Sequence, residues 1–448
     1  MACRVHFTAL RQVIRSSYDL PVSVIAATET EERADSRRLL RGRALVFAAI
    51  VLSALTLRAA VTSISPLFGR IGADLQFGST VVGLVGMLPP AMFAVSGLLT
   101  PILAKRTGLE LAALIAMSLT AVGMASRAFA PDTASLLLLS AVALVGMGIG
   151  NVVIPPLVKR YFSERLAVVS TIYICAMQIS TMVPPLLAVP VADVYGWRVS
   201  IGVWALVALA AAVPWLGVVL VHRRETKRTR ALAVTGLDID SADRAGDTAV
   251  AAAAPEGQIF RSSLAWGMAG MFAMTSFITY AMLTWLPTIL TDAGIGEARA
   301  GASVAAFGAM GLISSLVAPS LCARLNNPYG LVLGAAVFYL GGFSGLHFSP
   351  TEGTAFWVCL IGLGTLTFPM SLTLINLRTR TPVGSSRLSG FTQGLGYVVS
   401  ATGPLSFGLV HSLSGGWAVP MLMLTGCVAV LLVAGYFCCK PRMLEDTW

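Results

Sequence analysis

Long apolar stretches separated by short polar segments run along the chain. A transmembrane helix needs about 20 mostly apolar residues to cross the hydrocarbon core of a bilayer. Between the sixth and seventh stretches, a polar segment with several aspartates predicts a flexible linker at 222–261. The pattern predicts an all-α membrane protein with twelve transmembrane helices, at 44–68, 79–103, 110–130, 133–157, 167–191, 199–221, 262–288, 300–322, 329–348, 354–377, 388–411 and 417–438.

Composition supports this interpretation. Hydrophobic residues make up 56% of the 448 residues and charged residues only 12%, whereas soluble domains carry about 25% charged residues. So few charges cannot cover a water-soluble protein of this length, which argues against a soluble enzyme, a secreted disulfide scaffold and a disordered regulator. The seven cysteines form no Cys-x-x-Cys pair and no cluster with histidine, so neither a metal site nor a cofactor is expected.

The basic residues orient the predicted helices. Cytoplasmic loops of membrane proteins are enriched in Lys and Arg. With a cytoplasmic N-terminus, 26 of the 31 basic residues fall on the cytoplasmic side. The exceptions are Arg58, Arg70, Arg127, Arg198 and Arg299. We therefore predict a multi-pass protein of the cytoplasmic (cell) membrane with both termini in the cytoplasm, and we attribute the net charge of +10 to topology rather than to nucleic-acid binding.

The two halves of the chain repeat one another. Four features recur in order at offsets of about 220 residues, which indicates a parallel duplication. The matching pairs are Pro66 and Pro287, Pro101 and Pro319, Pro184 and Pro404, and Trp197 and Trp417. We predict an N-terminal tail (1–43), a six-helix bundle (44–221), a cytoplasmic linker (222–261), a second six-helix bundle (262–438) and a C-terminal tail (439–448).

This layout resembles the major facilitator fold, in which the substrate site lies near the midplane between two pseudo-symmetric halves. The run Gly146–Arg160 (GMGIGNVVIPPLVKR), Thr284–Leu290 (TWLPTIL) and Leu388-Ser389-Gly390 with Gln393 resemble the cyanate permease family, which includes 2-nitroimidazole transporters. The first span departs from the family's typical Asn-Leu-Arg-Pro, because Thr56-Leu57-Arg58-Ala59 stands there. The resemblance implies a secondary active transporter that moves a small anion or compact nitrogen-containing solute by alternating access.

Arg58 is the main candidate for chemistry inside the membrane. It falls about fourteen residues into the first span, near the bilayer centre at 1.5 Å per residue. A buried arginine is costly unless it meets water, an anion or backbone carbonyls, and its planar donors suit oxyanions and nitro groups. No Asp, Glu or His falls well inside a span, so its partner is expected to be solvent, backbone, substrate or an amide such as Gln178 or Gln393. Arg127, near a span end, is expected to reach toward the headgroups.

Neutral polar residues supply further candidates, since amides and phenols orient a small solute at low desolvation cost. The same residue types also join neighbouring helices, so both roles stay open. The candidates for substrate binding besides Arg58 are Asn151, Tyr173, Gln178, Tyr280, Trp285, Asn376, Gln393 and Tyr397. Lys105, Arg106 and Arg324, which follow the second and eighth spans, are candidates for a gating loop or for topology signals alone.

Other functions remain as alternatives. A drug or metabolite exporter of the same superfamily is the first, although such pumps commonly carry acidic residues within the membrane. A non-transporting receptor is the second, although the soluble segments here offer no signalling domain. An intramembrane enzyme would need a catalytic constellation at depth, and none is present in the sequence. The expected partners are a small-molecule substrate, a coupling proton or counter-ion and the lipid bilayer, with the chain acting as a monomer.

Overall fold

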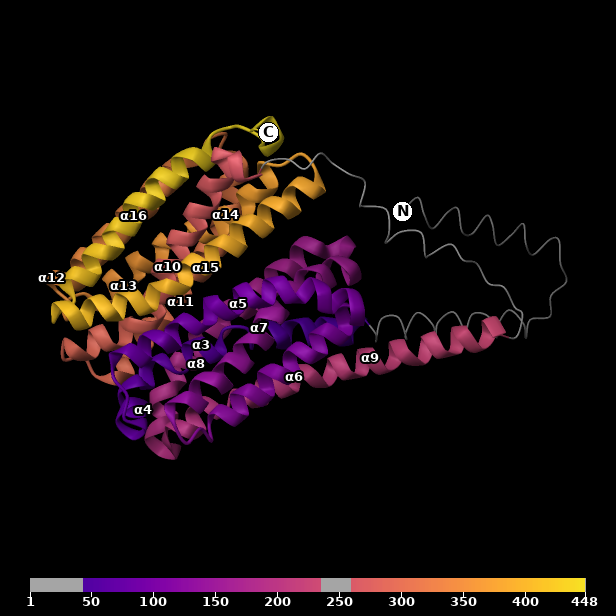
Figure 1. Ribbon diagram of the computed structural model, residues 1–448, viewed down its shortest axis with the longest axis horizontal. Helices are drawn as coiled ribbons and strands as arrows, with labels where there is room; N and C mark the ends of the chain where they lie inside the picture. The colour runs from indigo at the N-terminus through magenta and orange to yellow at the C-terminus, as the bar shows by residue number, and fades with distance from the viewer. Residues whose placement is uncertain (1–42, 235–258, 448) are drawn as a thin grey trace, which may run out of the picture. The chain divides into compact units, whose positions relative to one another are not determined.

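Helices form almost the whole described chain, as the long apolar stretches require. The computed structural model describes residues 43–234 and 259–447, and no strand occurs in these ranges (Figure 1). In the first half, residues 43–54 are helical and precede α3 (Ala59–Thr62), η1 (Ser65–Leu67), α4 (Phe68–Leu75), α5 (Ser79–Thr107), α6 (Leu109–Arg127), α7 (Thr133–Tyr161), η2 (Ser163–Arg165), α8 (Leu166–Gly202) and α9 (Ala205–Val234). The second half contains η4 (Ile259–Arg261), α10 (Ser263–Asp292), α11 (Glu297–Arg324), α12 (Tyr329–Phe348), α13 (Thr354–Gly364), α14 (Thr367–Leu377), α15 (Pro382–Ser414), α16 (Ala418–Cys439) and η5 (Leu444–Thr447).

Within the described ranges these helices make twelve membrane-spanning segments, which confirms the predicted fold class. Ten stretches are long and apolar enough to cross a membrane, and one of them, Val168–Val221, covers most of α8 and the first part of α9. α15 has more glycine and serine, but its 33 residues are long enough to complete the set. α8 is broken at Gly196, where a φ of +81° favours glycine and the chain turns before Trp197.

The first span is interrupted near its middle. Regular helix stops after residue 54, a turn covers residues 55–58, and α3 begins at Ala59. The backbone N–H of Arg58 donates to Ser180 Oγ of α8 at 3.0 Å, so a neighbouring helix satisfies a group that the break releases. Ala59 occupies the first position of a helix, which proline favours, and this is where the resembled family has proline.

Arg127 does not reach toward the headgroups, so that expectation is wrong. Its side chain is only 1% exposed. One guanidinium nitrogen donates to the carbonyl of Ala60 at 3.0 Å, and the other donates to Ser63 Oγ at 3.1 Å. Short helices leave carbonyl groups unpaired at their C-terminal ends. Because α3 has only four residues, Arg127 turns inward to pair the polar groups that the broken span exposes.

The two halves pack as two bundles and meet through equivalent helices. Helices α5 to α9 lie together, and helices α10 to α16 lie together (Figure 1). Across the interface α5 packs against α15 and α8 packs against α11. Because α5 and α11 are the second spans of their halves, and α8 and α15 the fifth, the two pairings are related by the duplication.

Two tryptophans repeat the same contact in each half. The indole N–H of Trp197 donates to Asp74 at 3.2 Å, and that of Trp417 donates to Asp292 at 3.2 Å. In each pair the aspartate lies at the C-terminal end of the first span of its half and the tryptophan opens the last span. The offset of about 220 residues therefore reflects a repeated tertiary contact.

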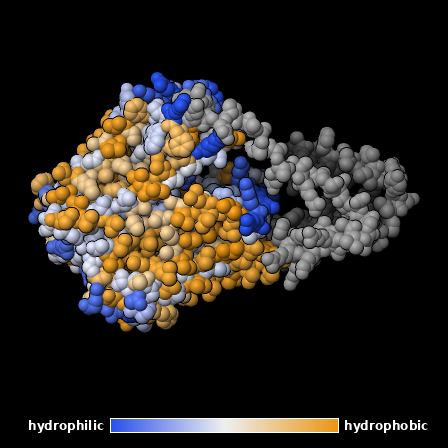
Figure 2. All heavy atoms as spheres, viewed as in Figure 1, coloured by the Kyte–Doolittle hydropathy of each residue, from blue (hydrophilic) through white to orange (hydrophobic). Residues whose placement is uncertain are grey.

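Polar and apolar residues occupy different parts of the described helices. On the face in Figure 2, apolar residues cover most of the described helices and hydrophilic residues gather at their ends, as a membrane environment requires. The predicted linker at 222–261 is helical in part, because α9 continues to Val234. The tail at 1–43, except for residue 43, and the linker at 235–258 lie outside the described residues.

Candidate functional site

A cavity of about 100 Å³ lies between the bundles, next to the break in the first span. Arg58 carries the only charge among the described residues that line it. From α10, Ser276, Thr279, Tyr280 and Leu283 face it, and their spacing of three and four residues places them on one side of the helix. α8 and α11 supply most of the remaining wall, so both bundles build the cavity.

Arg58 joins the two bundles inside this cavity. Its Nη1 donates to the hydroxyl of Tyr280 at 3.1 Å. Its guanidinium lies 5.4 Å from the centre of the Phe93 ring, within the range of a cation–π contact. Tyr397 of α15 is a further electrostatic partner. None of these groups carries a negative charge, so the guanidinium is partly buried without a counter-ion.

Gln178 makes a second contact across the cavity. Its Nε2 donates to the carbonyl of Gly308 in α11 at 3.4 Å. Of the partners expected for Arg58, neither amide pairs with it here, and the hydroxyl of Tyr280 accepts its hydrogen bond instead. Gln393 is occupied by Ser389, to which its Nε2 donates at 2.7 Å within α15.

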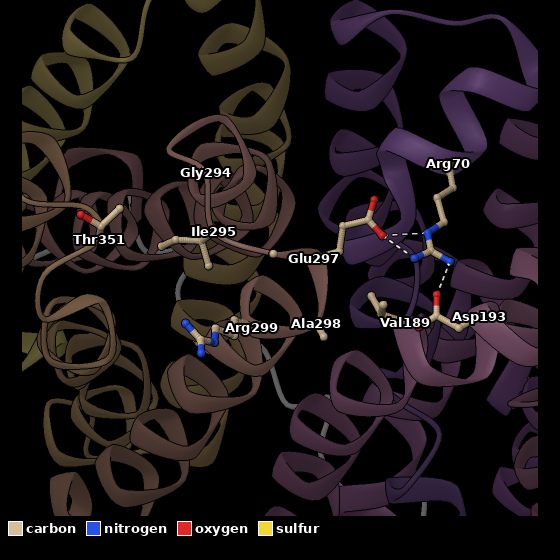
Figure 3. A pocket seen from close by; sticks show the side chains of 10 residues that line it. Arg70, Val189, Asp193, Gly294, Ile295, Glu297, Ala298, Arg299 and Thr351 are labelled. Carbon is tan, nitrogen blue, oxygen red and sulfur yellow. Dashed lines mark hydrogen bonds and ion pairs between the residues drawn. The ribbon is translucent and has the colours of Figure 1, made fainter.

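At one end of the bundles, which we call the Arg70 end, an ion-pair cluster closes the interface. Arg70 of α4 pairs with Asp193 of α8 at 2.8 Å and with Glu297 of α11 at 2.6 Å. Figure 3 shows Arg70 pointing to both carboxylates at the edge of a pocket of about 610 Å³. The Glu297 pair crosses between the bundles, whereas the Asp193 pair lies within one. Ser79 and Ser412 make a further link across the interface at 2.8 Å.

Glycines of α5 show that the interface is closed at the Arg70 end and open toward the opposite end, which we call the linker end. A Cβ at Gly86 would meet Pro404 Cβ at 2.7 Å and would also collide with Thr284. Gly97 lies eleven residues later on the same face of α5, yet a Cβ there would meet nothing within 4 Å. The C-terminal bundle therefore contacts α5 at Gly86 but not at Gly97, about 16 Å further along the helix.

A family model described as Major Facilitator Superfamily matches residues 49–404 of the chain. The chain belongs to the major facilitator superfamily. Its relatives within this superfamily are named as transporters. The chain is 29% identical to the uncharacterized transporter YycB of Bacillus subtilis (strain 168), over 88% of the chain and 93% of that protein.

Two Escherichia coli (strain K12) proteins are also similar to this superfamily member. The chain is 28% identical to the 2-nitroimidazole transporter, over 90% of the chain and 97% of that protein. It is 24% identical to the cyanate transport protein CynX, over 86% and 94%. The sequence resemblance to the cyanate permease and 2-nitroimidazole transporter family is therefore confirmed.

Solved structures share the fold at low sequence identity. A bacterial homolog of the human lysosomal transporter Spinster, inward-facing and occupied, superposes with a TM-score of 0.68 at 15% identity, over 91% of this chain and 98% of that chain. A D-xylose–proton symporter superposes with a TM-score of 0.65 at 12% identity, over 90% and 99%. These similarities support the major facilitator fold with two bundles.

The predicted substrate-binding residues fall into distinct places in this fold. Arg58, Gln178 and Tyr280 line the cavity, and Tyr397 reaches Arg58 from the neighbouring helix α15. Asn151 of α7 does not line the cavity, but its Nδ2 is buried and has no hydrogen-bond partner. Tyr173 is half-buried in α8, five residues before Gln178.

Trp285 and Asn376 do not line this cavity, and their role as substrate ligands stays a prediction. Trp285 is 1% exposed and donates its indole N–H to the carbonyl of Pro404 at 2.8 Å. Two residues along a helix rotate a side chain by about 200°, so Leu283 faces the cavity and Trp285 faces the other way. Asn376 is exposed near the end of α14, where its Oδ1 accepts a hydrogen bond from Ser385 at 2.9 Å.

The predicted gating residues Lys105, Arg106 and Arg324 are exposed at the linker end, and their role stays a prediction. The cavity hydroxyls of Ser276 and Thr279 were not among the predicted residues. The spacing of these residues with Tyr280 was a usable signal. An apolar helix gives little indication of which face it turns to a cavity, so the spacing alone did not single them out.

Proposed function

We propose that the chain moves a small anion or a compact nitro-bearing solute across the cytoplasmic membrane by alternating access, with Arg58 as the main substrate ligand. The observation that carries this proposal is the uncompensated charge of Arg58 in a cavity between the bundles. Burying a cation away from water is costly, and an anion that pairs with it offsets part of that cost. A cavity of about 100 Å³ favours a solute of a few heavy atoms over a bulky drug.

Tyr280 links binding to movement of the bundles in this mechanism. Arg58 belongs to the N-terminal bundle and Tyr280 to the C-terminal bundle, and their hydrogen bond is 3.1 Å long. A solute acceptor that pairs with the guanidinium forms a charge-assisted bond, which is stronger than the bond to a neutral phenol. The solute therefore replaces or bridges this contact and changes the balance between the closed and open arrangements.

The linker end faces the cytoplasm in this proposal, because basic residues concentrate toward the C-terminal ends of α5, α7 and α9. The conformation closed at the Arg70 end is then open to the cytoplasm. Transport in either direction requires the Arg70–Glu297 pair to separate while the cytoplasmic halves of the bundles approach. Asp193 stays with Arg70 in the N-terminal bundle, so the arginine keeps one partner when the other leaves.

Counterflow in proteoliposomes tests the role of Arg58, with cyanate, nitrate and 2-nitroimidazole as probes. Arg58→Ala is expected to lower uptake at least about 30-fold, because truncating one partner of a buried charged contact costs about 2 kcal/mol or more. Arg58→Lys keeps the charge but loses the planar donor fork, so it should transport weakly. Arg299→Ala, at an exposed arginine of the Arg70 end, is the matched control and should behave as wild type.

Thermal stability separates binding from a structural role. Removing an expensive buried charge should leave the melting temperature of Arg58→Ala unchanged or higher. Uptake at the wild-type rate in Arg58→Ala would remove the arginine from the mechanism. A large loss of stability in both variants would show that Arg58 instead ties the helices together.

A further inference from the structure

Among the described residues that line the cavity, Ser276 is the only one whose hydroxyl makes no hydrogen bond. It lies on α10, one helical turn before Tyr280, and lines the same cavity as Arg58. Its side chain is 1% exposed, and its Oγ has no hydrogen-bond partner. A buried hydroxyl in this condition is uncommon, because folded proteins pair most of their buried polar groups.

The other hydroxyls around the cavity are already paired. Serine and threonine in a helix commonly donate to the carbonyl three or four residues earlier. Thr181, Thr279, Ser315 and Thr365 all do so, at distances of 2.6 to 3.3 Å. The Tyr280 hydroxyl accepts from Arg58. Among these lining hydroxyls, only Ser276 Oγ has no hydrogen-bond partner at all.

Ser276 lies on the face of α10 that lines the cavity. Thr275, the preceding residue, faces the interior of its own bundle, where its hydroxyl meets that of Thr367 at 2.6 Å. Ser276 shares the cavity face with Thr279, Tyr280 and Leu283. Its Oγ has almost no exposed area in this conformation. A movement of the cavity wall on binding would therefore bring this donor into contact with a solute.

We propose that Ser276 is a specificity-determining substrate ligand, whose hydroxyl donates to a second acceptor atom of the solute held by Arg58. This inference rests on the proposed function of the same cavity. It narrows the substrate class to polyatomic anions and nitro compounds, which carry two or more acceptor atoms. One acceptor then pairs with the guanidinium and another with the serine hydroxyl, which fixes the orientation of the solute.

Equilibrium binding to the purified full-length chain in lipid nanodiscs tests this role, with 2-nitroimidazole and cyanate as the probes. Ser276→Ala is expected to weaken binding about tenfold, the loss typical of one hydrogen bond to a charged or strongly polar acceptor. Ser276→Cys keeps a weak donor of similar size and should fall between Ser276→Ala and wild type. The melting temperature without ligand should not fall in Ser276→Ala, because no bond inside the protein is lost.

Ser314 provides a matched control. Ser314→Ala removes a buried, unpaired hydroxyl that does not line the cavity, and should bind as wild type. A loss of affinity confined to the Ser276 variants supports the proposal.

The outcomes distinguish this inference from the proposed function. Wild-type affinity in Ser276→Ala, together with lost affinity in Arg58→Ala, would overturn the role of Ser276 and leave that of Arg58. A lowered melting temperature in Ser276→Ala with an equal loss in Ser314→Ala would identify a packing role and would also overturn the inference. If the probes bind equally to wild type and Arg58→Ala, or do not bind, the proposed function fails and the role of Ser276 fails with it.

Discussion

Gly86→Ala should open the Arg70 end of the transporter. Gly86 lies on the face of α5 that meets α10 and α15 of the other bundle. A Cβ at this position would lie 2.7 Å from Pro404 Cβ, whereas ordinary contacts begin at 3.4 Å. The interface must therefore give by roughly 0.7 Å, and a proline ring cannot swing aside as a flexible side chain does.

The magnitude follows from the cost of overpacking. Forcing an extra methyl group into a well-packed contact costs about 1–3 kcal/mol. The clash exists only where the bundles touch, so this cost raises the free energy of the closed arrangement alone. The ratio of open to closed molecules should then rise by a factor of about 5–150.

Labelling of Ser65→Cys measures this ratio. Ser65 is 2% exposed and lines a pocket to which Glu297 of the Arg70 end also belongs. When opening is fast and labelling is slow, the rate of reaction with a maleimide follows the open population. The rate should rise in Gly86→Ala by the factor given above.

Gly97→Ala is the matched control. It lies on the same face of α5, where a Cβ meets nothing within 4 Å, and it gains the same helix propensity as Gly86→Ala. Its labelling rate should equal that of the parent. Equal rates in the two alanine variants would refute the argument that the bundles close on Gly86.

Three further predictions concern the ends of the helices. Burial raises the pKa of the Glu445 carboxyl, but hydrogen bonds from the backbone N–H groups of Arg380 and Thr381 outweigh it, and the pKa is lowered. This depressed pKa stabilises the folded state at any pH above the pKa that Glu445 has in the unfolded chain. The stabilisation is lost as the pH falls through the pKa of Glu445 in the folded protein. A melting-temperature series from pH 6 to pH 3 should therefore decline more steeply for wild type than for Glu445→Gln. Arg127→Met should lower unfolding stability by about 2–4 kcal/mol in a denaturant titration, since Ala60 and Ser63 lose buried donors. In intact cells, an impermeant thiol reagent should label a cysteine at Glu352 from outside but a linker cysteine only after permeabilisation, and the reverse would invert the proposed orientation.

The sequence by itself determined the twelve spans, the duplication and the one arginine near the middle of the membrane. These features are local or periodic: the length of an apolar stretch is set by the bilayer thickness, and a charge at that depth stands out from its neighbours. The repeated Trp197 and Trp417 are recognisable because the same contact with an aspartate is needed in both halves.

Only the tertiary structure decided which polar residues meet. The break at residues 55–58 contains neither glycine nor proline. The backbone N–H of Arg58, which the break leaves without a carbonyl partner in its own helix, donates to Ser180 Oγ, more than a hundred residues away. The choice of Ser276 over Trp285 as a cavity residue depends on how α10 is rotated against its neighbours. A helix surrounded by lipid and by other apolar helices is apolar on every side, so its sequence does not reveal that rotation, and packing against the second bundle sets it.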